Sequence, residues 1–206
     1  MNQIAALQQL RAVGAPVLES RDVSAILNVT ASNATTILRR LAAAGLVTPL
    51  SWGRWLIDER IDPYALPELI SAPWPSYVSL QSALFLHGLI EQIPSVVYAV
   101  TLGRTRQVRT PLATLSYHRL PPALFDGFEL SGAYAAKVAT PEKALFDLFY
   151  LTPARSRLFA ALPEVTLPRR FQWSDLEAAL AKVPSKARRG CIVRRMHDLK
   201  ASQRSR

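Results

Sequence analysis

Cysteine is nearly absent from this 206-residue sequence, in which Cys191 stands alone. A single cysteine excludes internal disulfide bonds and is typical of a reducing cytoplasm. Histidine is also scarce, and His87, His118 and His197 lie far apart with no thiol or carboxylate pattern around them. The common zinc frameworks are therefore excluded, and we expect no metal site.

Long hydrophobic runs are missing as well. No apolar stretch approaches the ~20 residues of a membrane-spanning helix, and the opening segment MNQIAALQQL has no basic region before an apolar one. We therefore expect no membrane partner, no secretory signal and a cytoplasmic location. Hydrophobic residues make up 50% of the sequence, enough for the folded core of one or two domains.

Motifs of catalysis are absent too. The sequence contains no P-loop, GxGxxG or GxSxG, and no Gly-Ser followed by a close Asp-x-Asp. Glu142 and Asp147 share a predicted helix, but their spacing does not place them on one face. Lys143, one turn earlier, is the expected partner of Asp147. We therefore expect no catalytic residues and no cofactor.

The net charge of +10 is unevenly distributed. Residues 1–70 contain six Lys/Arg and six Asp/Glu, whereas residues 151–206 contain thirteen and four. The C-terminal end therefore carries nearly all of the excess. It can contact phosphates non-specifically, bind RNA or an acidic partner, or form a solvated tail. The arginines concerned include Arg188, Arg189, Arg194 and Arg195.

One amphipathic helix is indicated between Val29 and Val47. Its apolar stripe follows helical spacing, Thr30 is placed to cap its start, and Gly45 is placed to end it. The opposite face is short and polar at first and cationic further along, as in a helix that enters the DNA major groove. A solvated face is the alternative. The candidate DNA-binding residues of this face are Ser32, Asn33, Thr35, Thr36, Arg39 and Arg40.

The neighbouring segments favour the DNA-binding interpretation. A short helix from Ser20, its expected N-cap, to Leu27 precedes this helix after a tight turn, and an earlier helix buries Ile4, Leu7 and Leu10. A hairpin follows, with Arg54 at its tip as a further DNA contact. The pattern predicts a winged helix-turn-helix that binds double-stranded DNA. A winged helix used only for protein contacts is the alternative.

Four prolines between residues 63 and 76 predict a linker that contains about one helical turn. A DNA-binding domain is expected over residues 1–62 and a second domain over residues 77–206. In the second domain a helix capped by Ser79, two or three strands, a helix capped by Thr140 and a late helix capped by Ser174 predict a small sheet flanked by helices. The fold class is therefore α+β. A loop or hairpin between the strands carries Arg104, Arg106 and Arg109, a possible nucleic-acid or partner surface.

Two segments of the second domain resemble a known family. YVSLQSALFLHGL and TPEKALFDL, together with the N-terminal winged helix and VVYAVTL, are similar to the AbiEi antitoxins of AbiE-type abortive-infection toxin–antitoxin systems. The resemblance covers about residues 1–152. It implies a transcriptional regulator that represses its own operon at an inverted repeat, and a C-terminal domain that counteracts a nucleotidyltransferase-like toxin without needing a stable complex. It supplies no catalytic residues.

A second class of function stays open at this stage. The chain could be another kind of transcriptional regulator, or an RNA- or protein-interaction module that uses its basic C-terminal surface. The neutral balance of residues 1–70 is the feature that keeps this alternative.

Overall fold

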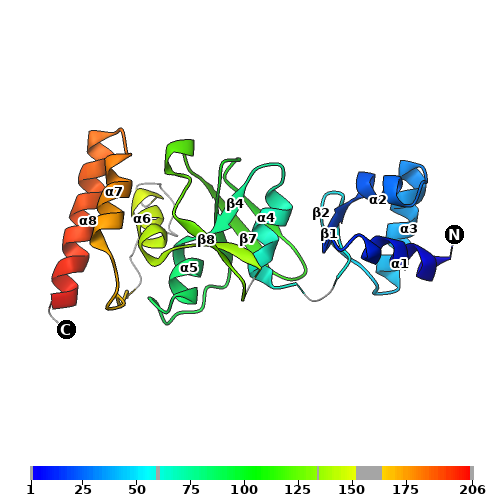
Figure 1. The fold of residues 1–206 in the computed structure, drawn as a ribbon, viewed down its shortest axis with the longest axis horizontal. Helices are drawn as coiled ribbons and strands as arrows, with labels where there is room; N and C mark the ends of the chain where they lie inside the picture. Colours follow the sequence, from blue (N-terminus) through cyan, green and yellow to red (C-terminus); the bar gives the residue numbers. More distant parts are fainter. Residues whose placement is uncertain (1, 59–60, 134, 152–163, 205–206) are drawn as a thin grey trace.

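The computed structural model describes residues 2–58, 61–133, 135–151 and 164–204. The molecule is elongated, and two units follow each other along its length (Figure 1). Residues 2–58 form the N-terminal unit, and the described residues from 61 onward form the C-terminal unit. Helices and two β-sheets together confirm the α+β class.

The N-terminal unit packs its helices against a small antiparallel sheet. The strand order is β1-β3-β2, with Leu18 and Pro49 paired to Trp55 from its two sides. Apolar side chains from both layers form a hydrophobic core of their own. The elements are α1 (Gln3–Ala12), β1 (Val17–Glu19), α2 (Ser20–Ile26), α3 (Ala31–Ala43), β2 (Thr48–Ser51) and β3 (Arg54–Leu56).

The predicted ends of α3 are confirmed. Thr30 is the N-cap, and its hydroxyl oxygen accepts a hydrogen bond from the Asn33 N–H at 3.3 Å. At the other end Gly45 adopts φ +70°, and the Leu46 N–H donates to the carbonyl of Leu41. This Schellman arrangement satisfies carbonyls that a helix otherwise leaves without partners.

The predicted cap of α2 is wrong by one residue. Glu19 is the N-cap, and it forms a capping box with Asp22. The Ser20 hydroxyl instead donates to the Gly53 carbonyl at 3.3 Å and accepts the Trp55 indole N–H at 2.9 Å. Ser20 therefore connects the start of α2 to the hairpin through both Gly53 and Trp55.

Residues 63–76 do not form the expected linker. They contain the 3₁₀ turn η1 (Pro63–Ala65), helix α4 (Leu66–Ser71) and the start of β4 (Ser76–Val78). Leu66 and Ile70 of α4 are buried in the core of the C-terminal unit. Pro63 and Pro67 stand in first turns of helical segments, where a proline costs no hydrogen bond.

The C-terminal unit is built on a mixed sheet of six strands, within the described residues. The strand order is β6-β7-β5-β4-β9-β8; β4–β9 and β5–β7 pair in parallel, and the other neighbours are antiparallel. β5 and β4 are buried along their whole lengths, which explains their β-branched and aromatic sequences. The further strands are β5 (Val97–Thr101), β6 (Arg106–Arg109), β7 (Thr114–Arg119), β8 (Phe128–Ser131) and β9 (Ala136–Ala139).

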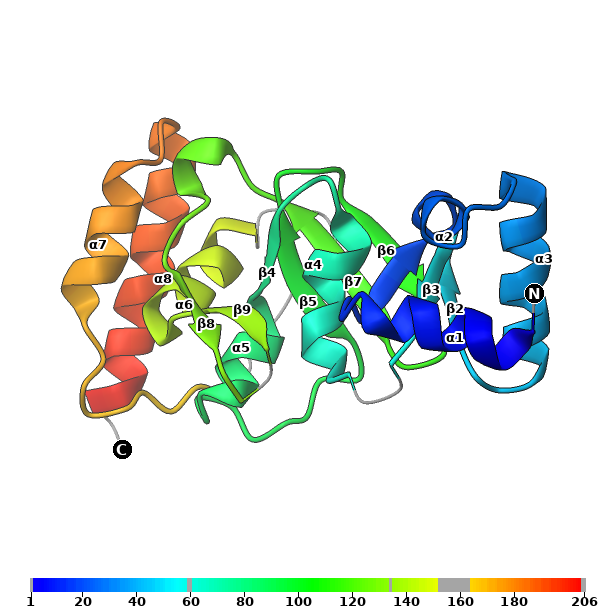
Figure 2. The ribbon, with the colours of Figure 1, turned by 45° about the vertical axis from the view of Figure 1, so that its right-hand side comes forward.

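Helices cover this sheet and extend the molecule away from the N-terminal unit (Figures 1 and 2). α5 (Leu80–Leu86) packs on α6 (Pro141–Leu151), which in turn contacts α7 (Trp173–Ala181) and α8 (Lys186–Arg204). The predicted capping of α7 by Ser174 is wrong, because Gln172 is the N-cap and the Ser174 hydroxyl contacts Asp175 instead.

A buried polar cluster joins β4, α5 and α6. The Asp147 carboxylate accepts hydrogen bonds from the hydroxyls of Tyr77 at 3.0 Å and Ser79 at 2.8 Å, and forms an ion pair with Lys143. The predicted Lys143–Asp147 pair is therefore confirmed. Ser79 is the N-cap residue of α5 as predicted, but its hydroxyl donates to Asp147 and forms no capping bond.

Within the described residues, none of the helices has the length and apolar composition of a membrane span.

Candidate nucleic-acid interface

The polar face of α3 is exposed as the sequence predicts. Ala34, Leu38 and Leu41 are buried in the core of the N-terminal unit. On the opposite side Thr35 is half-buried and the other candidates are open to solvent, namely Ser32, Asn33, Thr36, Arg39 and Arg40. A single helix therefore presents amide, hydroxyl and guanidinium groups along one accessible face.

The first turns of α3 offer both hydrogen-bond donors and acceptors. The hydroxyls of Thr35 and Thr36 donate to the carbonyls of Ala31 and Ser32, each at 3.0 Å, and their oxygens keep the capacity to accept a hydrogen bond. The Asn33 amide has no side-chain hydrogen bond within the described residues, and it can donate and accept at once. An amide that donates and accepts at once is complementary to the edge of adenine in the major groove.

Arg39 and Arg40 supply positive charge further along α3. Neither guanidinium forms an ion pair with another residue in the described ranges, and both are exposed. Because phosphate contacts come mainly from arginine and lysine, this part of the helix suits the DNA backbone. Two of the three acidic residues of the unit, Glu19 and Asp22, pair with Arg21 at 2.8 and 3.8 Å.

The boundary of the N-terminal unit changes the interpretation of its charge. Residues 1–58 contain five Lys/Arg and three Asp/Glu. The neutral balance of residues 1–70 arises because that longer range includes Asp62 and Glu68, which stand in the C-terminal unit. The folded N-terminal unit is therefore mildly basic.

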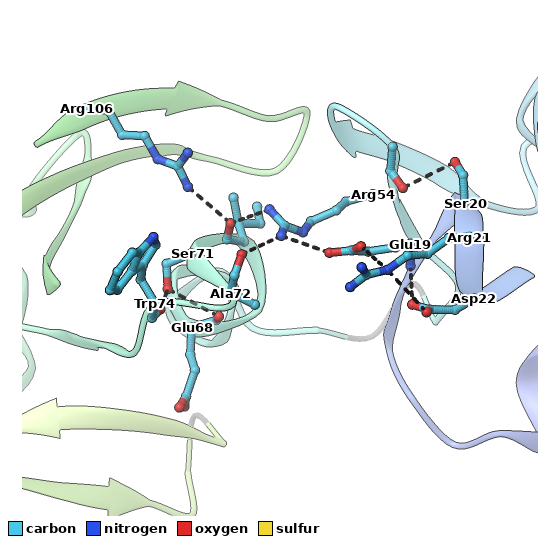
Figure 3. Close-up of polar contacts among 12 residues, drawn as sticks. Glu19, Ser20, Arg21, Asp22, Arg54, Glu68, Ser71, Ala72, Trp74 and Arg106 are labelled. Carbon is cyan, nitrogen blue, oxygen red and sulfur yellow. Dashed lines mark hydrogen bonds and ion pairs between the residues drawn. The ribbon is translucent and has the colours of Figure 1, made fainter. Parts of the chain in front are cut away.

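Arg54 does not lie at the tip of the hairpin, and its expected role as a free phosphate contact there is wrong. It is the first residue of β3, and its side chain is only 16% exposed. Its guanidinium donates to the carbonyls of Ile70 and Ala72, the latter at 2.6 Å, and pairs with Glu19 at 3.0 Å. Figure 3 shows this side chain pointing from the N-terminal unit into the C-terminal unit.

The hairpin tip is aromatic instead of cationic. The turn between β2 and β3 contains Trp52 and Gly53, and the Trp52 side chain is fully exposed. Trp52 therefore does not brace the hairpin against the helices. The sequence indicates a turn at Gly53, but local spacing does not determine whether the side chain of Trp52 or that of Arg54 is exposed at the tip.

The arginines expected in the loop between the strands divide into two groups. Arg104 and Arg106 line a cleft of ≈ 400 Å³ beside the edge strand β6, and Arg119 joins them from the end of β7. Arg109, at the far end of β6, is exposed and does not line this cleft. Sequence reasoning missed Arg119, because only the parallel pairing of β5 with β7 brings it to this place.

The basic C-terminal segment is a folded helix in the described residues up to 204. Ile192, Met196 and Leu199 of α8 are buried in the core of the C-terminal unit. Arg188 lies 4.5 Å from the centroid of the Tyr150 ring, an orientation typical of a cation–π contact. Arg194 is exposed, whereas Arg188, Arg189 and Arg195 are half-buried. Helix α8 lies at the opposite end of the molecule from α3 (Figure 1).

The histidines have structural environments. His118 is buried in β7 beside Ser116, whose hydroxyl lies 3.1 Å from the His118 Nε2. Burial lowers the pKa of His118 to about 4, so the ring is neutral at pH 7. The Nε2 of His87 lies 2.7 Å from the Ala139 carbonyl oxygen, a contact that connects the end of α5 to the end of β9.

No metal-binding cluster of three or more His, Cys, Asp or Glu side chains occurs in the part of the chain that the structure describes. In comparisons with known proteins, no protein-family model matches this chain and no curated protein matches it significantly. The resemblance to the AbiEi antitoxins therefore rests on the motifs alone.

Proposed function

We propose that the protein is a DNA-binding repressor of its own toxin–antitoxin operon, with the N-terminal unit as a winged helix-turn-helix. The observation that carries this proposal is the exposed face of α3. Near its start the Asn33 side-chain amide has no partner among the described residues, and neither does either of the two arginines further along. In this proposal α3 is the recognition helix: Asn33 and Ser32 contact base edges, and Arg39 and Arg40 contact phosphates.

The elements around α3 support this assignment. α2 precedes α3 after a turn of a few residues, and the β2–β3 hairpin follows. In the proposed winged helix this hairpin is the wing, and Trp52 at its tip packs against the sugar-phosphate backbone beside the major groove. A wing of this kind contributes apolar contact area, and the positive charge comes from α3.

The antitoxin part of the proposal depends on the resemblance to the AbiEi family. The two motifs that carry the resemblance are YVSLQSALFLHGL and TPEKALFDL. They form α5 and α6 with their flanking residues, and Ser79 of the first bonds to Asp147 of the second. We assign to the C-terminal unit the task of counteracting a nucleotidyltransferase-like toxin, without a catalytic step of its own.

A second candidate function is favoured by α8. This helix presents Arg194 to solvent and holds Arg188, Arg189 and Arg195 at its borders. Because it lies far from α3, it can contact RNA or an acidic protein independently of the N-terminal unit. In this alternative, Arg194→Ala weakens partner binding and Arg40→Ala does not.

A promoter-reporter assay in cells tests the repressor proposal. The DNA upstream of the gene drives a reporter, and the protein is supplied separately. We expect repression by the wild type and by Arg109→Ala, a matched arginine control on the other unit, but not by Arg40→Ala. Equal repression by Arg40→Ala at equal protein level contradicts the assignment of α3. Co-expression with the product of the adjacent gene tests the antitoxin part. If that product is a toxin that stops cell growth, we expect this protein to restore growth.

A further inference from the structure

The cleft of ≈ 400 Å³ that contains Arg104 is the strongest candidate site outside α3. It lies where the end of α4 approaches the edge of the six-stranded sheet, and its size is within the range of small-molecule pockets. The side chains that matter for its chemistry are those of Trp74, Arg104, Thr105, Arg106, Tyr117 and Arg119.

Positive charge dominates this cleft. Arg104, Arg106 and Arg119 line it, and no carboxylate does. Among the described residues, the guanidinium groups of Arg104 and Arg119 form no ion pair or hydrogen bond. Such groups bind phosphate oxygens through paired N–H donors. The arrangement therefore calls for an anionic ligand.

Arg106 is held in place at the border of the cleft. Its guanidinium donates to the Ile70 carbonyl at 3.3 Å and lies 5.5 Å from the centroid of the Tyr117 ring. Since only one of its N–H groups is used in this bond, the others stay available to a ligand. Part of the anion site is thus preorganised before any ligand binds.

An aromatic surface adjoins these cations. Trp74 is 56% exposed, which is unusual for so large an apolar side chain. It packs directly against Gly103, where an added Cβ would lie 3.0 Å from the Trp74 Cγ. Gly103 therefore lets the indole lie close against the backbone. Figure 3 shows Trp74 on the same side of α4 as the Arg106 side chain.

We propose that this cleft binds a nucleoside phosphate, with the base stacked on Trp74 and the phosphates on Arg104 and Arg119. Stacking on an aromatic side chain accepts any base, because every base has a π-face. The Thr105 hydroxyl oxygen accepts a hydrogen bond from the backbone N–H of Arg119 at 3.0 Å. The hydroxyl keeps its own proton to donate to a phosphate or ribose oxygen. The ligand is either a free nucleotide or the 5′-phosphorylated end of a single-stranded nucleic acid.

Isothermal titration calorimetry of the full-length protein with ADP tests this site. We expect ADP to bind, with pyrophosphate and adenosine each at least tenfold weaker. The double variant Arg104→Ala/Arg119→Ala and the single variant Trp74→Ala should each lose at least tenfold in affinity. Arg109→Ala is the matched control, since this arginine is exposed nearby but outside the cleft, and it should bind ADP as the wild type does.

A second titration separates the two sources of the ligand. If a 5′-phosphorylated hexanucleotide binds more tightly than ADP and depends on the same residues, the source is nucleic acid; if ADP binds more tightly, it is a free nucleotide. The proposal is overturned if neither probe binds, if pyrophosphate binds as tightly as ADP, or if the double variant keeps wild-type affinity. Because Arg104 and Arg119 are exposed, their replacement is expected to leave the fold intact, which circular dichroism checks.

Discussion

Arg54 and Arg106, from the two units of the molecule, both donate a hydrogen bond to the carbonyl oxygen of Ile70 (Figure 3). Ile70 lies in the last turn of α4, where helix carbonyls lack intrahelical partners and the helix dipole favours cations. Arg54 also binds the Ala72 carbonyl. The two units therefore meet at a helix end that requires donors, and β2 and β6 lie side by side next to it (Figure 2).

We expect Arg54→Ala to loosen this junction. Removing the guanidinium takes the Arg54 hydrogen bonds away from the carbonyls of Ile70 and Ala72, and it takes one partner away from Glu19. We expect the free energy of unfolding to fall by about 2–3 kcal/mol. Urea unfolding followed by circular dichroism measures the loss. Arg39→Ala, which removes an exposed arginine without such partners, should change the free energy of unfolding by no more than about 0.5 kcal/mol. Equal effects of the two variants contradict the junction.

The Asp147 cluster leads to a larger expected loss of stability. Asp147→Asn keeps the shape of the side chain but removes the charge that compensates Lys143, whose side chain is only 4% exposed. Breaking a buried ion pair from one side costs about 3–5 kcal/mol. Chemical denaturation measures this value. The control is Lys182→Ala, which breaks the half-exposed pair with Asp126 and should cost less than about 1 kcal/mol.

His118 makes the stability depend on pH. Burial lowers its pKa in the folded protein to about 4, from 6.5 in an unfolded chain. Between these values the unfolded state binds more protons, so stability is full above about pH 6.5 and falls as the pH drops toward 4. The part of the unfolding free energy that depends on this ring is on the order of 3 kcal/mol.

Unfolding free energies measured from pH 7.5 down to pH 4.5 check this expectation. In His118→Gln, whose amide can still bond to Ser116, the unfolding free energy should change less with pH than in the wild type. His197→Gln, at a side chain that is 85% exposed, should keep the whole slope. An unchanged slope in His118→Gln contradicts the assignment to this ring.

Local signals predicted the helices of the N-terminal unit well. Thr30 and Gly45 fix the ends of α3 through bonds to residues at most a few positions away, and such bonds can be inferred from spacing. Ile4 was wrongly expected to be buried, because α1 turns Ala6 inward in its place and leaves Ile4 63% exposed. Helical spacing alone did not decide between these two faces.

The errors that change the interpretation of the surface arise where distant segments meet. Arg54 was placed at the hairpin tip, but its pairing opposite Glu19 turns it toward α4. The burial of His118 was not predicted, because it depends on the place of β7 inside the sheet between β6 and β5, where the central residues of the strand are buried. The cleft beside Trp74 depends on the pairing of β5 with β7, which places Arg119 in it. Sheet order and contacts between units are not encoded in local spacing, so the sequence alone could not reveal them.

The central claim, that α3 reads DNA sequence, is tested most directly by fluorescence anisotropy. The full-length protein is titrated with DNA from upstream of its gene and with shuffled DNA, at two salt concentrations. We expect the wild type to keep its preference for the upstream DNA as salt rises. Asn33→Ala should lose about 1–3 kcal/mol of that preference, whereas Arg40→Ala should weaken binding to both DNAs and lower the salt dependence. Equal binding of both DNAs by the wild type, collapsing with salt, would contradict the account and move nucleic-acid binding to the basic helix α8.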